Sequence, residues 1–214
     1  MNREQGNTAA SKHKIRDKIH EFKREQILEV AGKLFYERGY RSTTVDAIAG
    51  QLSVTKPFIY YHFENKLDIL QTLLERTIRA SLHLFDDIDM ESGSPSDVLT
   101  ELIRKFTLNV IENQTLIALF WRDEKDLPIR NRENVRAMKR EFDMRLNRIL
   151  ERGVEAGEFE IEDIALTGLA IAGMVTWTYT WYRPDRRLSS DEIADRLARL
   201  TLNMVKARKT RSKK

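Results

Sequence analysis

The sequence has no cysteine, few turn-forming residues and no long apolar segment. Without cysteine, a disulfide framework, a cysteine-ligated metal and a thiol nucleophile are all excluded. Only 4 prolines and 9 glycines interrupt 214 residues rich in Leu, Glu, Arg, Ala and Ile, which is typical of helices. The polar N-terminus has no apolar core for a signal peptide, and no apolar run reaches transmembrane length. The sequence therefore predicts a soluble, cytoplasmic, all-α protein without membrane contact.

Catalytic motifs are missing as well. All 4 histidines precede residue 84, and there is no phosphate-binding glycine loop, no G-x-S-x-G and no H-E-x-x-H. Carboxylates such as Glu112, Asp123 and Glu124 have no nucleophile in a matching pattern. We therefore expect no enzymatic activity, no catalytic residue, no metal site and no cofactor.

The positive charge is concentrated at the two ends of the chain. Residues 1–24 contain seven basic and three acidic residues, and residues 206–214 contain six basic residues and no acidic one. Because the whole chain carries a net charge of +4, the segment between these ends is acidic. Basic ends suit contact with a polyanion. The C-terminal tail could equally be a disordered segment that aids solubility.

Apolar spacing predicts three helices early in the chain. The first runs from Lys23 to Gly39, where a glycine ends it, and its apolar stripe is Ile27, Val30, Ala31, Leu34 and Phe35. A second, short helix follows the cap residues at 42–44. A third runs over 56–63, with a proline in its first turn. The last two, joined by a tight turn, are typical of a helix-turn-helix unit.

The segment VTKPFIYYHFENK, residues 54–66, is unusually rich in rings and hydroxyls. In a helix-turn-helix, the start of the second helix faces base edges, while hydroxyls and cations hold phosphates. Ile59 and Phe63 are expected in the core; the alternative is that all the rings are core. The predicted DNA contacts are Thr44, Val45, Thr55, Lys56, Pro57, Phe58, Tyr60, Tyr61, His62 and Lys66. Because residues 25–66 are electrically neutral, further phosphate affinity is expected from Lys12, Lys14, Arg16 and Lys18.

The run QILEVAGKLFYERGYRSTTVDAIAGQLSVTKPFIYYHFENKLDIL, residues 26–70, resembles the N-terminal domain of TetR-family transcriptional regulators. The shared pattern is LF-x-x-x-G-Y-x-x-T-T, then I-A, a V-T step and I/L-Y-x-H-F-x-x-K-x-x-L. Two departures are Ser53, where the family often has glycine, and Pro57-Phe58, where small residues are usual. The resemblance implies a homodimer of DNA-binding domains on larger helical bodies that carry a ligand pocket.

The remainder of the chain is also predicted to be helical. One long helix is expected from residue 67 to about 85, a linker at 90–97, and further helices at about 97–112, 114–124, 131–156, 161–182 and 190–208, which gives about nine helices in all. The expected division is a basic, flexible arm (1–22), a helix-turn-helix DNA-binding domain (23–68), a helical ligand-binding and dimerisation domain (69–208) and a basic tail (209–214).

The last two long helices are the predicted dimer surface. One contains small residues that permit close helix approach, and the other has an apolar stripe, so two helices from each subunit would form a four-helix bundle. Each position could instead be intrachain core. The predicted dimer residues are Leu169, Ala172, Gly173, Ile193, Leu197, Leu200 and Met204.

Large rings in the C-terminal half predict a hydrophobic ligand pocket, although they could equally form a filled core. The segment TWTYTWYRPDRRLSSDEIADRL, residues 176–197, resembles TetR-like regulators of fatty-acid and steroid catabolism, whose effectors are acyl-CoA thioesters. Arg183, Arg186 and Arg187, or Arg122, Arg130 and Arg132, could bind the CoA phosphates; Arg183 could instead cap its helix. The predicted ligand residues are Phe106, Phe120, Trp121, Met138, Phe142, Met174, Trp177, Trp181 and Arg183.

The sequence thus predicts a ligand-responsive repressor that binds a palindromic operator as a homodimer. Its predicted effector is bulky and hydrophobic, an acyl-CoA or steroid-derived CoA thioester. One alternative is a repressor of an efflux or detoxification gene that responds to a neutral planar drug. Another is a DNA-binding protein without a small-molecule effector.

Overall fold

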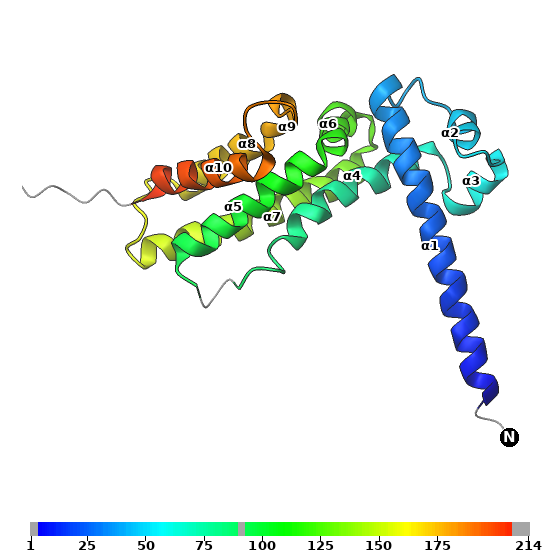
Figure 1. Ribbon diagram of the computed structural model, residues 1–214, viewed down its shortest axis with the longest axis horizontal. Coiled ribbons are helices and arrows are strands. Elements are labelled where there is room, and N and C mark those ends of the chain that lie inside the picture. Colours follow the sequence, from blue (N-terminus) through cyan, green and yellow to red (C-terminus); the bar gives the residue numbers. More distant parts are fainter. Residues whose placement is uncertain (1–3, 90–92, 207–214) are drawn as a thin grey trace, which may run out of the picture. The chain divides into compact units, whose positions relative to one another are not determined.

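The computed structural model describes residues 4–89 and 93–206, with side chains from residue 15 onward. The predicted tail (209–214) and the first three residues of the predicted linker (90–92) lie outside these ranges. Within them the chain is all-α, as predicted, and the single extended feature is an antiparallel bridge between Phe159 and Lys206 (Figure 1). No helix of the described chain is long and apolar enough to span a bilayer. The elements are α1 (Glu4–Arg38), α2 (Val45–Gln51), α3 (Lys56–His62), α4 (Lys66–His83), α5 (Pro95–Glu112), α6 (Gln114–Asp123), the 3-10 helix η1 (Glu124–Asp126), α7 (Ile129–Glu155), α8 (Ile164–Thr176), α9 (Thr178–Trp181) and α10 (Ser190–Val205).

The chain divides into two compact units, Met1–Leu74 and Glu75–Lys214. We call them the head and the body. The division lies inside α4, so the boundary predicted after residue 68 falls earlier on the same helix.

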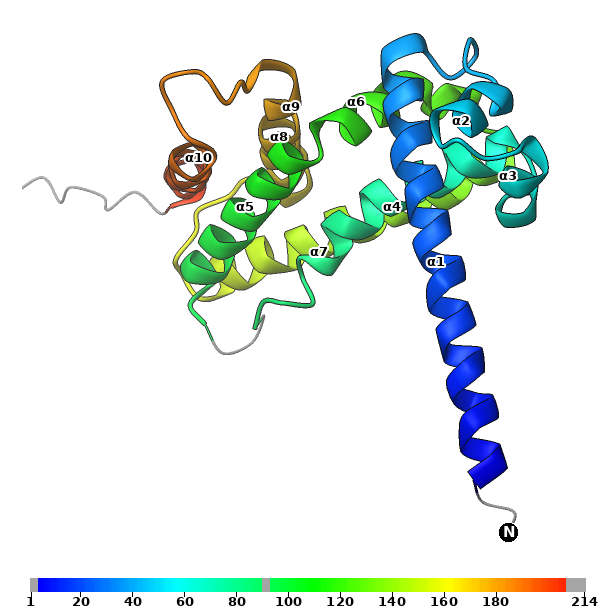
Figure 2. The same cartoon turned by 45° about the vertical axis from the view of Figure 1, so that its right-hand side comes forward.

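The first helix is much longer than predicted. α1 continues without a break from Glu4 to Arg38, whereas a start near Lys23 and a flexible arm before it were expected (Figure 2). Residues 4–22 contain no proline and a single glycine, so few residues there oppose a helix. The basic residues of the predicted arm are therefore carried on a helix that continues into the head.

Four of the five residues of the predicted apolar stripe lie in the core of the head, and Val30 is half-buried. Ile27, Ala31, Leu34 and Phe35 of α1 are buried, as are Ile59 of α3 and Phe63 after it. Gly39 ends α1 as predicted: its φ is +85°, and its N–H donates to the Phe35 carbonyl at 2.9 Å. The spacing of apolar residues alone was enough to locate this core.

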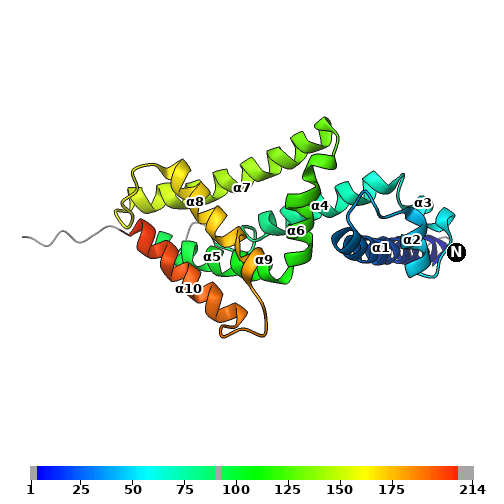
Figure 3. The same ribbon diagram turned by 90° about the horizontal axis from the view of Figure 1, so that it is seen from above.

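The body is organised around α5. α10 packs along α5, and α7 and α8 pack against it and against each other (Figure 3). Ser94 caps α5 by accepting from the Asp97 N–H, and Ser189 forms a capping box with Glu192 at the start of α10. These caps explain why both helices begin where they do.

The helix predicted over 161–182 is divided into α8 and α9 at Trp177. The Thr178 hydroxyl donates to the Val175 carbonyl and the Thr180 hydroxyl to the Trp177 carbonyl, both at 2.8 Å. Threonine side chains that bond nearby carbonyls compete with the helical ladder. The division therefore has a local cause that apolar spacing did not reveal.

Candidate functional site

The head contains a helix-turn-helix whose turn has Schellman geometry. The Ser53 N–H donates to the Gly50 carbonyl at 3.1 Å, and the Val54 N–H donates to the Ala49 carbonyl at 3.0 Å. Ser53 has a φ of +55°, in the left-handed region that favours glycine. The serine therefore maintains the tight turn, with some backbone strain.

Hydroxyl groups stand at the N-termini of both helices. Thr44 is exposed and caps α2 by accepting from the Ala47 N–H at 3.1 Å. Thr55 is exposed at the start of α3 and makes no side-chain cap bond. Two helix N-termini with free or partly used hydroxyls are suitable donors to phosphate oxygens.

The exposed face of α3 carries a cation and two phenols. Tyr60 is 46% and Tyr61 74% exposed, and Pro57 is exposed beside them. Lys56 lies 2.9 Å from Asp46 of α2, and this hydrogen bond raises the pKa of Lys56. Because both partners are solvent-exposed, the pair is weak and a phosphate or base can replace Asp46.

Three residues predicted to contact DNA are less accessible than expected. Val45 and His62 are buried, and Phe58 is half-buried. His62, predicted to contact DNA, is covered because α1 extends past α3: the His20 ring lies 4.5 Å from the His62 ring. The Phe58 ring, one turn earlier on α3, lies 4.9 Å from the His62 ring.

His62 is a polar group with an unsatisfied ring nitrogen within this aromatic cluster. Its Nδ1 is buried and has no hydrogen-bond partner in the described chain. Burial lowers the pKa of His62, and the nearby His20, Arg24 and Lys23 lower it further. The Arg24 guanidinium also donates to the His62 carbonyl and lies 4.1 Å over the Phe63 ring. His62 is therefore part of the packing between α1 and α3.

Lys66, another predicted DNA contact, is engaged within the head. Its Nζ donates to the carbonyls of Thr43 at 2.8 Å and Tyr40 at 2.9 Å, and it lies 4.4 Å over the Tyr40 ring. A longer contact reaches the Arg41 carbonyl at 3.4 Å. Lys66 thus tethers the α1–α2 turn instead of presenting a free cation.

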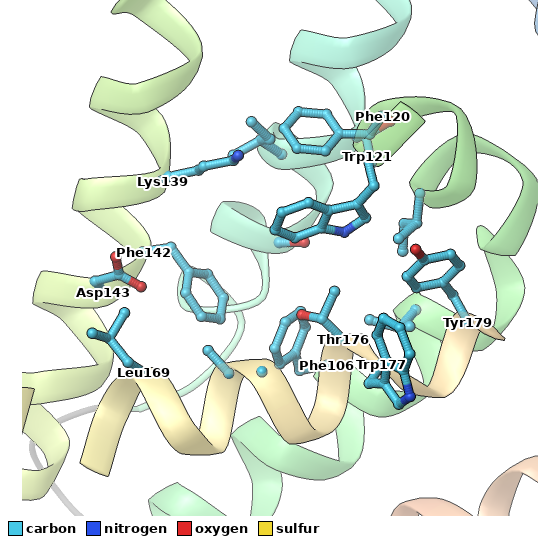
Figure 4. A pocket seen from close by; sticks show the side chains of 17 residues that line it. Phe106, Phe120, Trp121, Lys139, Phe142, Asp143, Leu169, Thr176, Trp177 and Tyr179 are labelled. Carbon is cyan, nitrogen blue, oxygen red and sulfur yellow. The ribbon is translucent and has the colours of Figure 1, made fainter. Parts of the chain in front are cut away.

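The body contains a cavity of about 470 Å³. Helices α4 to α9 contribute to it, and its lining is mainly aromatic and aliphatic (Figure 4). Five of the nine predicted ligand residues line it: Phe106, Phe120, Trp121, Phe142 and Trp177. This volume and this lining are typical of a site for a hydrophobic small molecule.

The other four predicted ligand residues lie outside the lining. Met174 packs against the core, and Met138 and Trp181 lie on parts of α7 and α9 that do not face the cavity. Arg183 donates to the carbonyls of Tyr182 at 2.6 Å and Thr180 at 3.4 Å, so it caps α9 as the alternative interpretation proposed. Whether an apolar residue lines the cavity depends on the direction in which its side chain leaves the helix, and apolar content does not specify that direction.

Several lining residues were not predicted as ligand contacts. Lys139 and Asp143 of α7 are the two charged members, and Tyr179 lies across the cavity from them (Figure 4). Lys139 and Asp143 are four residues apart and flank Phe142, and this spacing could have indicated that both residues line the cavity. Leu169, Ala172 and Gly173, predicted as dimer residues, also line the cavity.

Other predicted dimer residues divide between core and surface. Ile193 and Leu197 of α10 are buried within the body, whereas Leu200 and Met204 are about half exposed. On α8, Leu166 and Leu169 are more than half exposed, as is Trp177 at its end. An apolar surface thus exists on α8 and α10, at partly different residues from those predicted.

Both units match models of known families. A model described as bacterial regulatory proteins, tetR family, matches residues 27–73. A model described as Tetracyclin repressor-like, C-terminal domain, matches residues 92–205, which is more than half of the chain.

Individual proteins match over most of the chain. The HTH-type transcriptional repressor KstR2 of Rhodococcus jostii is 25% identical over 184 residues, which cover 85% of this chain and 90% of KstR2. The crystal structure of PfmR from Thermus thermophilus has a TM-score of 0.76 and 31% identity, covering 83% of this chain and 97% of PfmR. AibR, solved in complex with isovaleryl coenzyme A and operator DNA, has a TM-score of 0.72 and 25% identity, covering 83% of this chain and 96% of AibR.

Proposed function

The chain belongs to the TetR family of bacterial regulatory proteins, and we propose that it is a transcriptional repressor released from its operator by a bulky hydrophobic effector. It is a DNA-binding regulator, not an enzyme. One observation carries the proposal: a single chain combines an exposed helix-turn-helix with a separate apolar cavity of about 470 Å³. Such a protein would act in the cytoplasm, where the operator is.

The exposed residues of the head have distinct proposed roles on DNA. Thr44, Thr55, Tyr60 and Tyr61 would hold phosphates, which sets the orientation of the head. Lys56 would exchange Asp46 for guanine O6 or N7, and Pro57 with the exposed part of Phe58 would contact thymine methyl groups. Val45, His62 and Lys66 would support these contacts from within the head.

The repressor would bind a palindromic operator as a homodimer. The exposed apolar residues on α8 and α10, with Leu166, Leu169, Leu200 and Met204 among them, are suited to pairing with a second copy in a four-helix bundle. Half-sites would then be separated by about 34–36 Å or a multiple of it.

We favour an acyl-CoA or steroid-derived CoA thioester as effector. The cavity volume suits an acyl or steroid group, and AibR, a structural neighbour, was solved with isovaleryl coenzyme A. Exposed Arg130, Arg186 and Arg187 are candidates for the CoA phosphates. Arg122 pairs with Asp123 at 3.0 Å and Arg183 caps α9, so these two arginines are less available to a CoA phosphate than the other three.

Thermal denaturation against a panel of CoA thioesters, free fatty acids, sterols and planar drugs tests the effector class. A ligand that binds only the folded protein raises the midpoint in proportion to the logarithm of its concentration. We expect one CoA thioester to raise the midpoint. The same thioester should release the protein from an operator sequence that was selected from a random duplex library. A shift with a planar drug alone would favour an efflux repressor, and no shift would favour a DNA-binding protein without effector.

Gly173→Leu provides a matched variant for this test. Gly173 lines the cavity, and a Cβ atom built at this position meets no atom within 4 Å. A leucine side chain there can therefore occupy part of the cavity without displacing the backbone. The variant should lose the ligand-induced shift, and size-exclusion chromatography must show that it is still a dimer, because Gly173 is also a predicted dimer residue. An unchanged shift would place the effector elsewhere.

A further inference from the structure

The cavity has two charged side chains, Lys139 and Asp143, one helical turn apart on α7. Both enter from the same side, while the remaining lining is apolar or carries neutral hydroxyl and indole N–H groups (Figure 4). A charged group in apolar surroundings is costly unless it is paired. The partners of these two groups therefore indicate which of them is available to a ligand.

Lys139 is already paired. Its Nζ lies 2.9 Å from the Glu124 carboxylate of η1. The same ammonium lies 4.4 Å from the centre of the Phe120 ring and 4.7 Å from that of Trp121. Its charge is balanced by Glu124, and its remaining surface rests on two aromatic faces.

Asp143 differs from Lys139 in this respect. In the described residues, no group donates a hydrogen bond to its carboxyl, because the Lys139 ammonium is directed toward Glu124. Burial raises the pKa of Asp143, and the charge of Lys139 opposes this only in part. In Figure 4 the carboxyl lies beside Leu169 and Phe142 at the edge of the cavity. Asp143 is therefore an acceptor whose hydrogen-bonding capacity is not used by the protein.

We propose that Asp143 selects ligands that carry a neutral hydrogen-bond donor, a hydroxyl or an amide N–H, next to their apolar part. This inference rests on the proposed role of the cavity as the effector site. An acceptor that meets a donor discriminates against the analogue that lacks it, because the half-buried Asp143 carboxyl is then left unpaired.

Charged ligand groups fit this position less well. A ligand carboxylate would face the Asp143 carboxyl, and the positive charge of Lys139 is already matched by Glu124. A ligand cation at Asp143 would be repelled by the positive charge of Lys139, one helical turn away. A neutral donor satisfies Asp143 without either conflict.

Dissociation constants of three probes test the proposal on the full-length protein and on Asp143→Leu. The probes are decanoyl-CoA, 3-hydroxydecanoyl-CoA and S-ethyl decanethioate, which lacks the amide groups of CoA. If the donor is a hydroxyl, the wild type should prefer the hydroxylated ester by about tenfold or more, and Asp143→Leu should lose this preference. If the donor is an amide N–H of CoA, Asp143→Leu should weaken both CoA esters by about tenfold and leave the ethyl thioester unchanged.

Control variants separate recognition from folding. Asp143→Asn keeps an acceptor oxygen and should retain part of the preference. Glu151→Gln, an exposed acidic residue elsewhere on α7, should change none of the constants. The unliganded Asp143→Leu protein should melt no lower than wild type, because an unpaired carboxyl has been removed from an apolar site.

The outcomes distinguish this proposal from the proposed effector class. Equal affinity of Asp143→Leu and wild type for all three probes would overturn the role of Asp143 and leave the CoA effector standing. If no CoA ester binds, 1-decanol and 1-methoxydecane replace the probes: a preference for the alcohol that Asp143→Leu loses supports Asp143 without CoA. No preference between them, or no binding of either, would overturn the proposal as well.

Discussion

Replacing Lys66 by methionine should weaken operator binding by loosening the head, without removing a phosphate contact. The ammonium donates to the Thr43 carbonyl at 2.8 Å and the Tyr40 carbonyl at 2.9 Å, on the turn that precedes α2. Methionine retains the apolar part of the side chain and removes the donor. The turn that positions Thr44 then loses its tether to α4.

The expected loss follows from these contacts. A hydrogen bond from a charged donor contributes about 1.5–3 kcal/mol, and the third contact, at 3.4 Å to the Arg41 carbonyl, is too long to add much. The freed carbonyls lie in a partly exposed turn and can bind water, so the two good bonds are not lost in full. We expect the head to be destabilised by roughly 2–3 kcal/mol.

Hydrogen exchange of peptides covering residues 39–51 measures this effect in the head. Tryptophan fluorescence would miss it, because Trp121, Trp177 and Trp181 all belong to the body. The salt dependence of operator binding is the second readout. Each lost phosphate contact reduces the slope of log K against log salt by about 0.9, so Lys66→Met should leave the slope unchanged.

Tyr61→Phe is the matched comparison, because Tyr61 is 74% exposed and is a proposed phosphate contact through its hydroxyl. It should weaken operator binding while leaving exchange in residues 39–51 as in wild type. A Lys66→Met protein with normal exchange and a slope reduced by about 1 would refute our reasoning, since Lys66 would then be a phosphate contact after all.

Three further predictions concern stability. Ser53→Gly should stabilise the head by about 0.5–1 kcal/mol in hydrogen exchange, because glycine accepts the φ of +55°, whereas Ser53→Ala should not. Gly153→Ala should destabilise the body, as followed by tryptophan fluorescence in denaturant, by about 1–3 kcal/mol or more, because the new Cβ would lie 1.8 Å from the Phe159 ring; a wild-type midpoint would contradict this. The pKa of His62 in the folded head is below the ordinary 6.5, so the unfolded chain binds a proton more readily and the head loses stability as the pH falls. After correction for the intrinsic pH dependence of exchange, amides of the head should exchange faster at about pH 5.5 than at about pH 7.5, and His62→Gln should reduce that difference.

The head was largely predictable because its signals are local. Ile27, Leu34 and Phe35 repeat at helical spacing, Gly39 ends the helix, and Ile59 with Phe63 lies four residues apart on one face. What could not be predicted depends on contacts between distant residues. Arg24 reaches a carbonyl 38 residues away, and Lys66 reaches one 26 residues away.

The cavity was predictable in kind but not in detail. The excess of rings in the C-terminal half indicated an apolar site, and Phe106, Trp121 and Phe142 do line it. Lys139 and Asp143 went unpredicted, because a charged residue on a polar helix is ordinarily solvated. Asp143 is half-buried and lines the cavity because α7 packs against other helices of the body, which local spacing does not specify.

By itself, the sequence determined the all-α class, the core of the head and the position of the reading helix, because helical periodicity and capping act within a few residues. Tertiary structure alone decided which polar groups are used internally and which remain available. That distinction separates Lys66, held by the Thr43 and Tyr40 carbonyls, from the exposed Tyr61, and Lys139, paired with Glu124, from Asp143. The physical reason is that an ionised side chain takes whichever partner the fold brings within hydrogen-bond distance, and sequence spacing does not encode that partner.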